Sequence, residues 1–285
     1  MRVMERIQIR LLTESDIPAA MALKQSAGWN QTEADWRRLL MLEPQGCFGA
    51  VKDDRLVGTT TTTTYGDELA WIGMVLVHPE SRRLGIASQL MKTALDYLKE
   101  KVVTVKLDAT ALGKPVYEKL GFRVESLVER WSGMGISTSS ASAPERIDES
   151  ARRELFELDR RAFNCDRSDL VAALIDDAVT PPALVRDQDK SLSGYGLSRS
   201  GTNADYVGPI VASASDQVDA LLDIVLNELN GRRVYIDFNT GSTADSKLLV
   251  DRGFVKERDL IRMCTGMPRP SNSAQVFAIA GPETG

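Results

Sequence analysis

The order of strands and helices repeats along this chain, and that repeat constrains the fold more than any other feature of the sequence. In each copy an apolar strand is followed by a helix, a second strand, a short helix ending in Gly-Phe, and a charged strand. The matching segments are 71–77 with 206–212, 105–108 with 234–237, and 117–122 with 249–254. Because these segments recur in the same order, the sequence predicts a duplicated unit of mixed α and β structure.

Local patterns complete the first copy. Alternating or β-branched residues predict strands at 7–12, 47–52 and 56–65, and apolar residues at helical spacing predict helices at 17–27, 31–41 and 85–100. The Ser-, Ala- and Thr-rich stretch 137–144 shows no apolar period and is typical of a linker. We therefore expect an α/β fold (an α+β mixed sheet) in two domains, residues 1–135 and 149–285, joined by a linker at 136–148.

Six consecutive threonines, Thr59 to Thr64, favour a strand, because β-branched side chains suit an extended backbone. Two interpretations of this run stay open. The hydroxyls on one face of the strand either line a polar pocket or belong to an ordinary strand that binds nothing.

The two copies differ between the first strand and its helix. The first copy carries a ten-residue loop, 78–87, that reads His-Pro-Glu-Ser-Arg-Arg-Leu-Gly-Ile-Ala, whereas the second carries a short Ser-Ala-Ser-Asp stretch. A helix N-terminus presents free backbone N–H groups and the positive end of a dipole, which suits a phosphate. Small Gly85 and Ala87 let a diphosphate approach the backbone, while Arg82 and Arg83 add positive charge. The first loop is therefore a candidate anion site; the alternative is a helix start with solvated arginines.

Charge and composition exclude several functions. The net charge is -5 and no run of Lys or Arg exceeds two residues, so we expect no nucleic-acid partner. The three cysteines, Cys47, Cys165 and Cys264, are far apart and do not have the spacing of a metal-binding motif. The sequence has one histidine, His78, so we expect no metal. No apolar run approaches the ~20 residues of a membrane span, and the N-terminus lacks a signal-peptide core. We expect no membrane contact and a cytoplasmic location.

The loop resembles the acetyl-CoA pyrophosphate loop of the GNAT N-acetyltransferases, whose pattern is Arg/Gln-x-x-Gly-x-Gly/Ala. Arg82, Gly85 and Ala87 meet that pattern, and the flanking segments 75–80 and 117–122 follow the family's order. Further segments resemble a two-part subgroup in which a degenerate GNAT-like half follows a catalytic one; they are 71–75, 107–110, 159–167, 206–210 and 277–282. The resemblance implies a tandem GNAT acyl-CoA N-acyltransferase fold with a degenerate second copy, and acetyl-CoA as the co-substrate.

The resemblance also implies which residues hold acetyl-CoA. The backbone of residues 75–77 would pair with the pantetheine arm like an extra strand, and a backbone N–H near Val75 would polarise the thioester oxygen. The loop and the start of the helix would hold the diphosphate. The expected binding residues are Val75, Leu76, Val77, Arg82, Arg83, Leu84, Gly85, Ile86, Ala87, Ser88 and Tyr117.

Tyr117 is also the candidate general acid, because the family carries a Tyr at this helix position that reaches the CoA sulfur. A phenol with a pKa of ~10 stays protonated at neutral pH and can protonate a departing thiolate; a core aromatic is the alternative. The base that deprotonates the amine is left open. Glu68 and Asp108 lie near the relevant strand ends, although each could instead be a turn or capping residue.

The second half lacks the Arg/Gly loop, so we expect it to bind no CoA and to wall off the acceptor pocket. Candidates for that wall are Asp166, Arg167, Tyr206 and Asp237, which could equally be structural ion pairs or caps.

The expected reaction moves an acetyl group to a primary amine of a small molecule by direct attack in a ternary complex. An amino sugar, polyamine, amino acid or antibiotic would be such an acceptor. The alternatives are acetylation of a protein lysine or N-terminus, and a non-catalytic acyl-CoA-binding sensor. The chain is expected to be a monomer or a homodimer.

Overall fold

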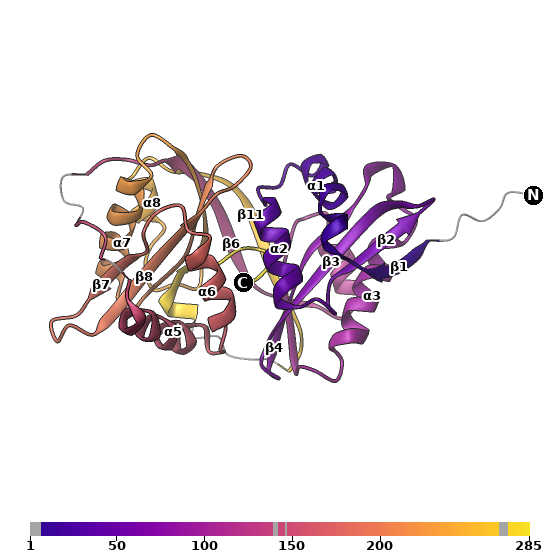
Figure 1. Ribbon diagram of the computed structural model, residues 1–285, viewed down its shortest axis with the longest axis horizontal. Coiled ribbons are helices and arrows are strands. Elements are labelled where there is room, and N and C mark those ends of the chain that lie inside the picture. Colours follow the sequence, from indigo (N-terminus) through magenta and orange to yellow (C-terminus); the bar gives the residue numbers. More distant parts are fainter. Residues whose placement is uncertain (1–6, 139–141, 146, 268–272) are drawn as a thin grey trace, which may run out of the picture.

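The computed structural model describes residues 7–138, 142–145, 147–267 and 273–285 (Figure 1). Below, residues 1–135 are called the N-terminal half and residues 149–285 the C-terminal half. The expected linker at 136–148 lies partly outside the described residues.

The N-terminal half contains strands β1 (Gln8–Leu11), β2 (Phe48–Lys52), β3 (Arg55–Tyr65), β4 (Leu69–Val77), β5 (Thr104–Ala109) and β6 (Arg123–Met134), and helices α1 (Ile17–Ser26), α2 (Glu33–Leu42), α3 (Ile86–Leu98) and α4 (Lys114–Lys119). The C-terminal half contains helices α5 (Glu149–Phe163), α6 (Ser168–Asp176), α7 (Ser215–Glu228) and α8 (Lys247–Val250), and strands β7 (Ala183–Arg186), β8 (Leu192–Arg199), β9 (Asp205–Ala212), β10 (Arg233–Asn239), β11 (Val255–Gly266) and β12 (Val276–Ala278). The strands and helices predicted in the first copy are confirmed, with ends that shift by about two residues, as element ends usually do.

Local chemistry explains where several elements begin. Thr32 caps α2, because its hydroxyl accepts the N–H of Asp35 while the Asp35 carboxylate accepts the N–H of Thr32. Asp53 and Asp54 both adopt positive φ angles, 50° and 58°, and make the tight turn between β2 and β3.

All twelve strands of the described residues join in one sheet, in the order β1-β2-β3-β4-β5-β11-β6-β10-β12-β9-β8-β7. The repeated segments of the sequence become β4 and β9, β5 and β10, and β6 and β11. The mixed α/β class is therefore confirmed, and the two copies have the same plan.

The two halves exchange their last long strands. β11 of the C-terminal half pairs with β5 of the N-terminal half, and β6 of the N-terminal half pairs with β10 of the C-terminal half. β6 and β11 also pair with each other, antiparallel, at the middle of the sheet. Figure 1 shows this pair between the purple N-terminal half and the orange C-terminal half. Each half thus completes the sheet of the other.

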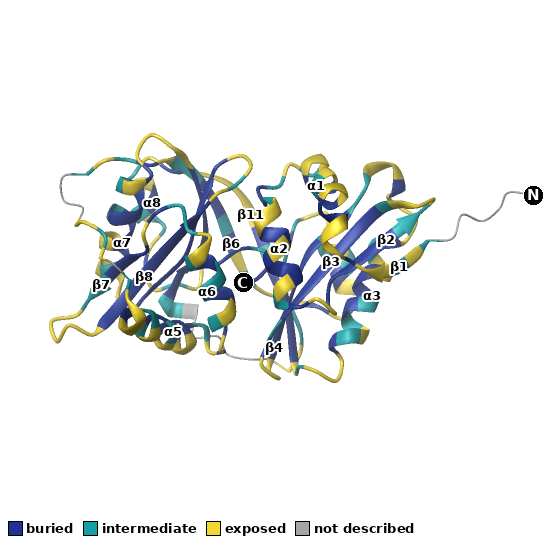
Figure 2. Cartoon of the chain, in the orientation of Figure 1, coloured by how far each residue is buried: buried dark blue, intermediate teal, exposed yellow. Residues whose placement is uncertain are grey.

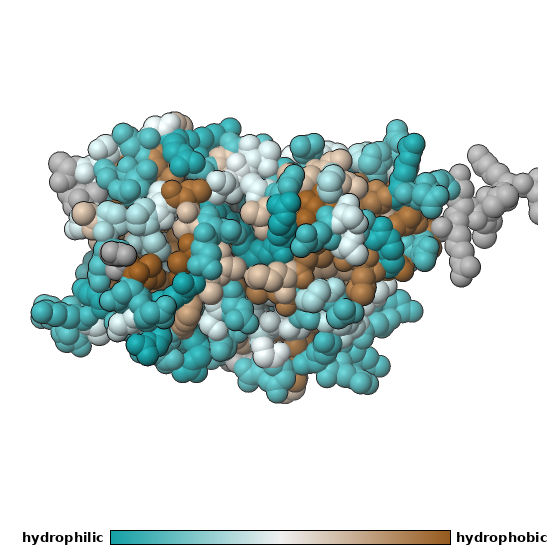
Figure 3. All heavy atoms as spheres, viewed as in Figure 1, coloured by the Kyte–Doolittle hydropathy of each residue, from teal (hydrophilic) through white to brown (hydrophobic). Residues whose placement is uncertain are grey.

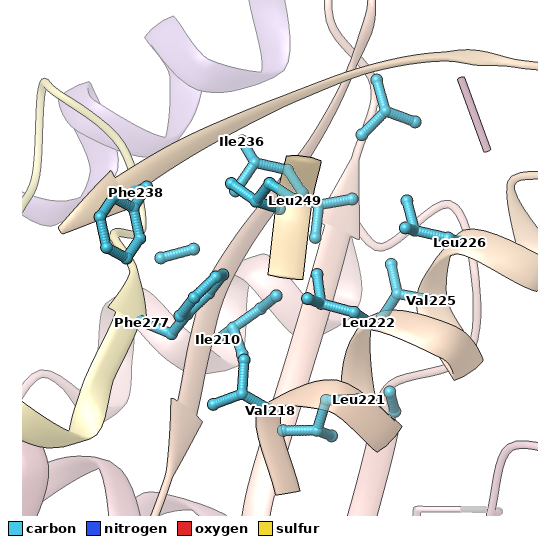
Figure 4. Close-up of a cluster of buried hydrophobic side chains, with 14 of the residues drawn as sticks. Ile210, Val218, Leu221, Leu222, Val225, Leu226, Ile236, Phe238, Leu249 and Phe277 are labelled. Atoms are coloured by element: carbon cyan, nitrogen blue, oxygen red, sulfur yellow. The ribbon is translucent and has the colours of Figure 1, made fainter. Parts of the chain in front are cut away.

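Helices cover both faces of the sheet. In the N-terminal half α3 packs against one face, and α1 and α2 pack against the other. In the C-terminal half α7 packs onto β9 and β10, where Leu222 meets Ile210 and Ile236 (Figure 4). A further cluster joins the halves, because Trp71 of β4 packs with Leu155 of α5 and other residues of the C-terminal half.

Buried residues therefore continue through the middle of the molecule (Figure 2), while hydrophilic residues cover most of the face drawn in Figure 3. None of the helices in the described ranges combines the length and the apolar composition needed to cross a membrane.

Candidate functional site

Strand β4 is interrupted by a bulge at Met74. Thr61 of β3 pairs with Gly73 and Thr59 pairs with Leu76, so the register shifts between these two pairs. Met74 has a φ of 50°, which non-glycine residues seldom adopt. The Thr59 hydroxyl donates a 2.8 Å hydrogen bond to the Met74 carbonyl. Part of the threonine run thus holds the bulge, a feature that often re-aims backbone groups beside active sites.

Strands β4 and β5 separate at this bulge. They run parallel and pair through Leu69 with Thr104, Ala70 with Val105, and Trp71 with Lys106. Within the described residues they pair no further, although β4 continues to Val77. The strands therefore open like a V, and β4 presents the backbone of Val75, Leu76 and Val77 towards the gap. An extended ligand that carries amide groups could enter here as an additional strand.

The open end of the V leads to the N-terminus of α3. Arg82, Arg83, Leu84 and Gly85 are all exposed, and Gly85 begins the 13-residue helix with a φ of 76°. The first-turn N–H groups of Ile86, Ala87 and Ser88 have no acceptor within the helix by its geometry. A Cβ added at Gly85 would meet nothing nearer than the Gln89 amide nitrogen at 4.0 Å. The space before the helix is therefore open, and its charge and donors fit a phosphate group.

Tyr117 of α4 lies on the α3 side of the sheet, in the same core cluster as Ile86 and Leu107. Its ring packs edge-on against Phe122, with 6.1 Å between the ring centroids. Burial raises the pKa of Tyr117 to about 12, so the hydroxyl keeps its proton at neutral pH. The side chain has the protonation state that a general acid needs.

The structure separates the two candidate bases. Glu68 is exposed in the turn before β4, six residues from Met74, which corresponds to about 20 Å along a strand. The side chain of Asp108 on β5 is buried and accepts two 2.9 Å hydrogen bonds from the Arg262 guanidinium. Burial raises the pKa of Asp108, and Arg262 opposes that rise. Asp108 therefore lies by the V and Glu68 does not.

The C-terminal half has an equivalent V between β9 and β10, and its own chain fills it. β9 and β10 pair in parallel through Asp205 with Val234, Tyr206 with Tyr235, and Val207 with Ile236. Beyond these pairs β12 inserts between them, bonded to β9 and to β10. Just before α7, the Gln217 side chain accepts the N–H groups of Ser213 and Ala214. This second V offers no room for a strand-like ligand.

Three of the four candidate wall residues lie in buried networks between the halves. Arg167 forms a bidentate pair with Asp159 and donates to the Gly285 carbonyl. Asp237 pairs with Arg130 of β6 and accepts the hydroxyl of Tyr206. Asp166 is exposed and caps α6 through the N–H of Ser168. The structure brings Arg167, Tyr206 and Asp237 to the junction and leaves Asp166 outside it.

Within the described ranges, no three His, Cys, Asp or Glu side chains gather closely enough to hold a metal ion. The side chains of Cys47 and Cys165 are buried, and that of Cys264 is half-buried.

Comparison with known families agrees with this geometry. Residues 13–122 match the model of the acetyltransferase (GNAT) family, and residues 155–278 match a second model, an acetyltransferase (GNAT) domain. The chain is a tandem GNAT protein. The V and the exposed loop lie within the first of its two GNAT regions.

The likeness to three known proteins extends over most of this chain and most of theirs. An uncharacterised N-acetyltransferase of Bacillus subtilis, YitH, is 26% identical over 94% of this chain and 95% of its own. A holothin acyltransferase of a Pseudoalteromonas species is 23% identical over 90% of this chain and 87% of its own. A solved structure of a candidate acetyltransferase from Pyrococcus horikoshii has a TM-score of 0.84 at 22% identity, covering 98% of this chain and 96% of its own. The last comparison confirms the expected fold.

The sequence marked residues 277–282 as part of the resemblance but did not indicate that the segment 279–285, which we call the tail segment, packs beside the V. It follows β12 and crosses to β3 and β4. Trp71 of β4 donates to the Pro282 carbonyl at 3.1 Å, and Tyr65 of β3 donates to the Thr284 carbonyl at 2.6 Å. Small cavities flank it, of about 10 Å³ beside Gln31 and Tyr206 and about 30 Å³ beside Trp71. The Gly-Pro pair at 281–282 signals a turn, but nothing local in the sequence says against which strand that turn packs.

Proposed function

We propose that this protein transfers the acetyl group of acetyl-CoA to the primary amine of a small molecule, by direct attack within a ternary complex. The observation that carries the proposal is the V between β4 and β5, which opens onto the exposed N-terminus of α3. The filled V of the C-terminal half supports it, because β12 there shows that such a gap accepts an extended strand. Acetyl-CoA combines an extended amide-containing arm with a diphosphate, and the residues present fit both.

Each part of the N-terminal site has a role in this proposal. Val75, Leu76 and Val77 pair through their backbone with the pantetheine arm, and a β4 N–H beside the bulge polarises the thioester carbonyl. The diphosphate is held by Arg82, Arg83 and the first-turn amides of α3. Acetyl-CoA supplies an activated acyl group in the form of a thioester. Tyr117 holds the proton that the departing thiolate receives, and a carboxylate removes the proton of the amine.

A small acceptor is favoured over a protein. The face of β4 that carries Trp71 and Gly73 is covered by the C-terminal half and the tail segment. A protein lysine presented by a folded partner needs an open groove at this place. The name of one relative, the holothin acyltransferase, also indicates a small-molecule acceptor for that protein.

We expect Gly85→Glu to weaken acetyl-CoA binding on the order of 100-fold, because it removes charge-assisted contacts and places a carboxylate where the diphosphate lies. The φ of 76° at Gly85 adds backbone strain for any side chain. The measurement is the acetyl-CoA dissociation constant by calorimetry, followed by free thiol release with a panel of small amines.

Gly231→Glu is the matched control for this variant. Gly231 is exposed, has a φ of 75° and has no atom within 4 Å of an added Cβ. Gly231→Glu therefore introduces the same backbone strain and the same charge as Gly85→Glu, but in the C-terminal half. It should bind acetyl-CoA like the wild type. Equal weakening in both variants would show that the loop is not the binding site, and absence of amine-dependent thiol release in the wild type would overturn the proposed reaction.

One acetyl-CoA should bind per chain. The second V is filled by β12 and Gln217 binds the backbone just before α7, so the C-terminal half has no place for a second molecule. Titration with acetyl-CoA should saturate at a molar ratio of one; a ratio of two would contradict the assignment of one binding half.

A further inference from the structure

The tail segment touches the sheet at the point where the acyl group would lie. A Cβ added to Gly73 would stand 2.6 Å from the Cα of Glu283. Gly73 immediately precedes the bulge at Met74, so the backbone of Glu283 packs against the strand whose N–H groups are aimed into the V. The close approach requires a glycine here and fixes Glu283 beside the reaction centre of the proposed function.

The Glu283 carboxylate is buried between residues of both halves. One oxygen accepts a 3.1 Å hydrogen bond from Arg199 of β8, and the other accepts a 2.8 Å hydrogen bond from the Gln31 amide. Arg199 also donates to Asp35 of α2 at 3.0 Å, so two carboxylates share one guanidinium. Glu283 itself is 3% exposed.

Burial raises the pKa of Glu283 above its usual range; the Arg199 guanidinium opposes that rise, and the Asp35 carboxylate adds to it. The titratable or charged side chains that interact with it, one from each packing element, are Arg199 on β8, Asp35 on α2, Arg130 on β6, Tyr206 on β9 and Tyr65 on β3. A carboxylate with a raised pKa holds a proton more readily than an ordinary glutamate, which is the property a general base needs near neutral pH.

Two buried polar atoms without a hydrogen-bond partner among the described residues lie on the same side of the sheet as this carboxylate. The Gln31 side-chain oxygen and the Thr61 hydroxyl are buried and have no hydrogen-bond partner in the part of the chain that the structure describes. Gln31 bonds Glu283 and lines the cavity of about 10 Å³, and Thr61 pairs with Gly73 across the strands, which places it on the same face of the sheet. Buried polar atoms are rarely left unpaired, so these two indicate a polar ligand group. An ammonium is the size of a water and has the N–H donors that both oxygens can accept.

Asp108 is another buried carboxylate by the V, and it is less suited to accept a proton. Both of its oxygens are held by one guanidinium, that of Arg262, and protonation would break this bidentate pair. Glu283 has a single contact to a guanidinium, and its second partner is a neutral amide.

We propose that Glu283 binds the acceptor ammonium and removes its proton, an assignment that rests on the proposed function. The ammonium gives one proton to Glu283, and the lone pair that is freed attacks the thioester carbonyl. The C–N bond forms and the C–S bond breaks, while Tyr117 protonates the sulfur. The nitrogen loses a second proton as the amide forms, and that proton restores the Tyr117 hydroxyl. Glu283 then returns its proton to solvent.

The test is the pH dependence of kcat for Glu283→Gln in the full chain, at saturating acetyl-CoA, with two amines from the panel that differ in pKa. In the wild type kcat should fall as the pH drops through the pKa of Glu283, at the same pH for both amines, because the base works only when ionised. In Glu283→Gln we expect kcat at neutral pH to fall by about 100-fold. The remaining activity should rise with pH and break at a different pH for each amine.

Glu283→Asp keeps the carboxylate. Its pH profile of kcat should still break at the same pH for both amines, with a kcat between those of the wild type and Glu283→Gln. Glu43→Gln is the matched control, since Glu43 is a buried glutamate that bonds Tyr97 of α3 instead of the tail segment. It should keep the wild-type profile, and acetyl-CoA binding should be unchanged in all three variants.

Two results overturn the assignment separately. A wild-type break that follows the pKa of the amine, or a Glu283→Gln kcat within threefold of the wild type, removes Glu283 from the base role and leaves the proposed function intact. A wild type that binds acetyl-CoA but discharges it to no amine overturns the proposed function, and the role of Glu283 falls with it.

Discussion

Asp237→Ala is expected to lower the free energy of unfolding by about 3–5 kcal/mol, because it leaves a buried guanidinium without its partner. Arg130 donates to the two Asp237 oxygens at 2.8 Å and 2.6 Å, and both side chains are at most 5% exposed. The Tyr206 hydroxyl loses one of its acceptors in the same change. Denaturant unfolding of the variant and the wild type measures the difference directly.

The position of this pair gives the prediction a second part. Arg130 and Asp237 face each other across β6 and β10, where the N-terminal half completes the sheet of the C-terminal half. Since β6 also pairs with β11, and β11 with β5, we expect both halves to lose hydrogen-exchange protection in one transition. Loss of protection confined to β8 and β9 would contradict a shared sheet.

Two further variants separate charge burial from a general sensitivity to substitution. Asp251→Ala removes an exposed partner of Lys247 and should leave the unfolding curve unchanged. Arg130→Met combined with Asp237→Leu should recover most of the stability, because apolar side chains of similar volume leave no unpaired charge. An equal loss in the double variant would mean that the ion pair itself, and not the orphaned charge, stabilises the junction.

Local sequence was sufficient for the elements of the first copy and for the loop at Arg82 to Ala87, whereas α6, β7, β8 and β12 were not predicted. The strand before the loop and the amphipathic helix after it follow from neighbouring residues, and the structure has them where the patterns put them. The repeat also predicted that β4, β5 and β6 correspond to β9, β10 and β11.

Long-range pairings were not accessible in this way. The sequences of β5 and β11 would suit pairing with several other strands. The pattern of a buried strand does not specify which strand lies beside it. The insertion of β12 into the second V and the contact of Glu283 with Gly73 both depend on the strand order of the whole sheet. Gln31 and Glu283 are 252 residues apart, and the sequence around either residue does not indicate that they are in contact.

The threonine run shows the same limit within one strand. Its β-branched residues predicted β3 correctly, but Thr59 holds the bulge while Thr61 is buried without a partner. The hydrogen bond of Thr59 fits the ordinary strand, and the interpretation that other hydroxyls of the run line a polar pocket stays a prediction.

Tyr117→Phe is expected to lower kcat by about 10²–10⁴-fold, the range in which a general acid contributes. The ring remains, so its edge-on contact with Phe122 and the packing of α4 are preserved, and acetyl-CoA binding should change far less than kcat. Steady-state kinetics with the best amine of the panel measure the effect. Tyr97→Phe on α3 is the matched control; its hydroxyl bonds Glu43 and Lys101, away from the V, so kcat should stay at the wild-type value.

The nature of the leaving group decides whether Tyr117 acts as an acid. When the donor is the acetyl thioester of an aromatic thiol, the leaving group is a stable thiolate that needs no proton. The kcat values of the wild type and of Tyr117→Phe should therefore be similar with such a donor. Because burial raises the pKa of Tyr117 to about 12, its proton stays in place up to strongly alkaline pH, and the wild type should show no fall in kcat from Tyr117 ionisation below about pH 11. A deficit of the same size on both donors would instead mean that the hydroxyl positions the acyl group, and the thiolate would then take its proton from solvent.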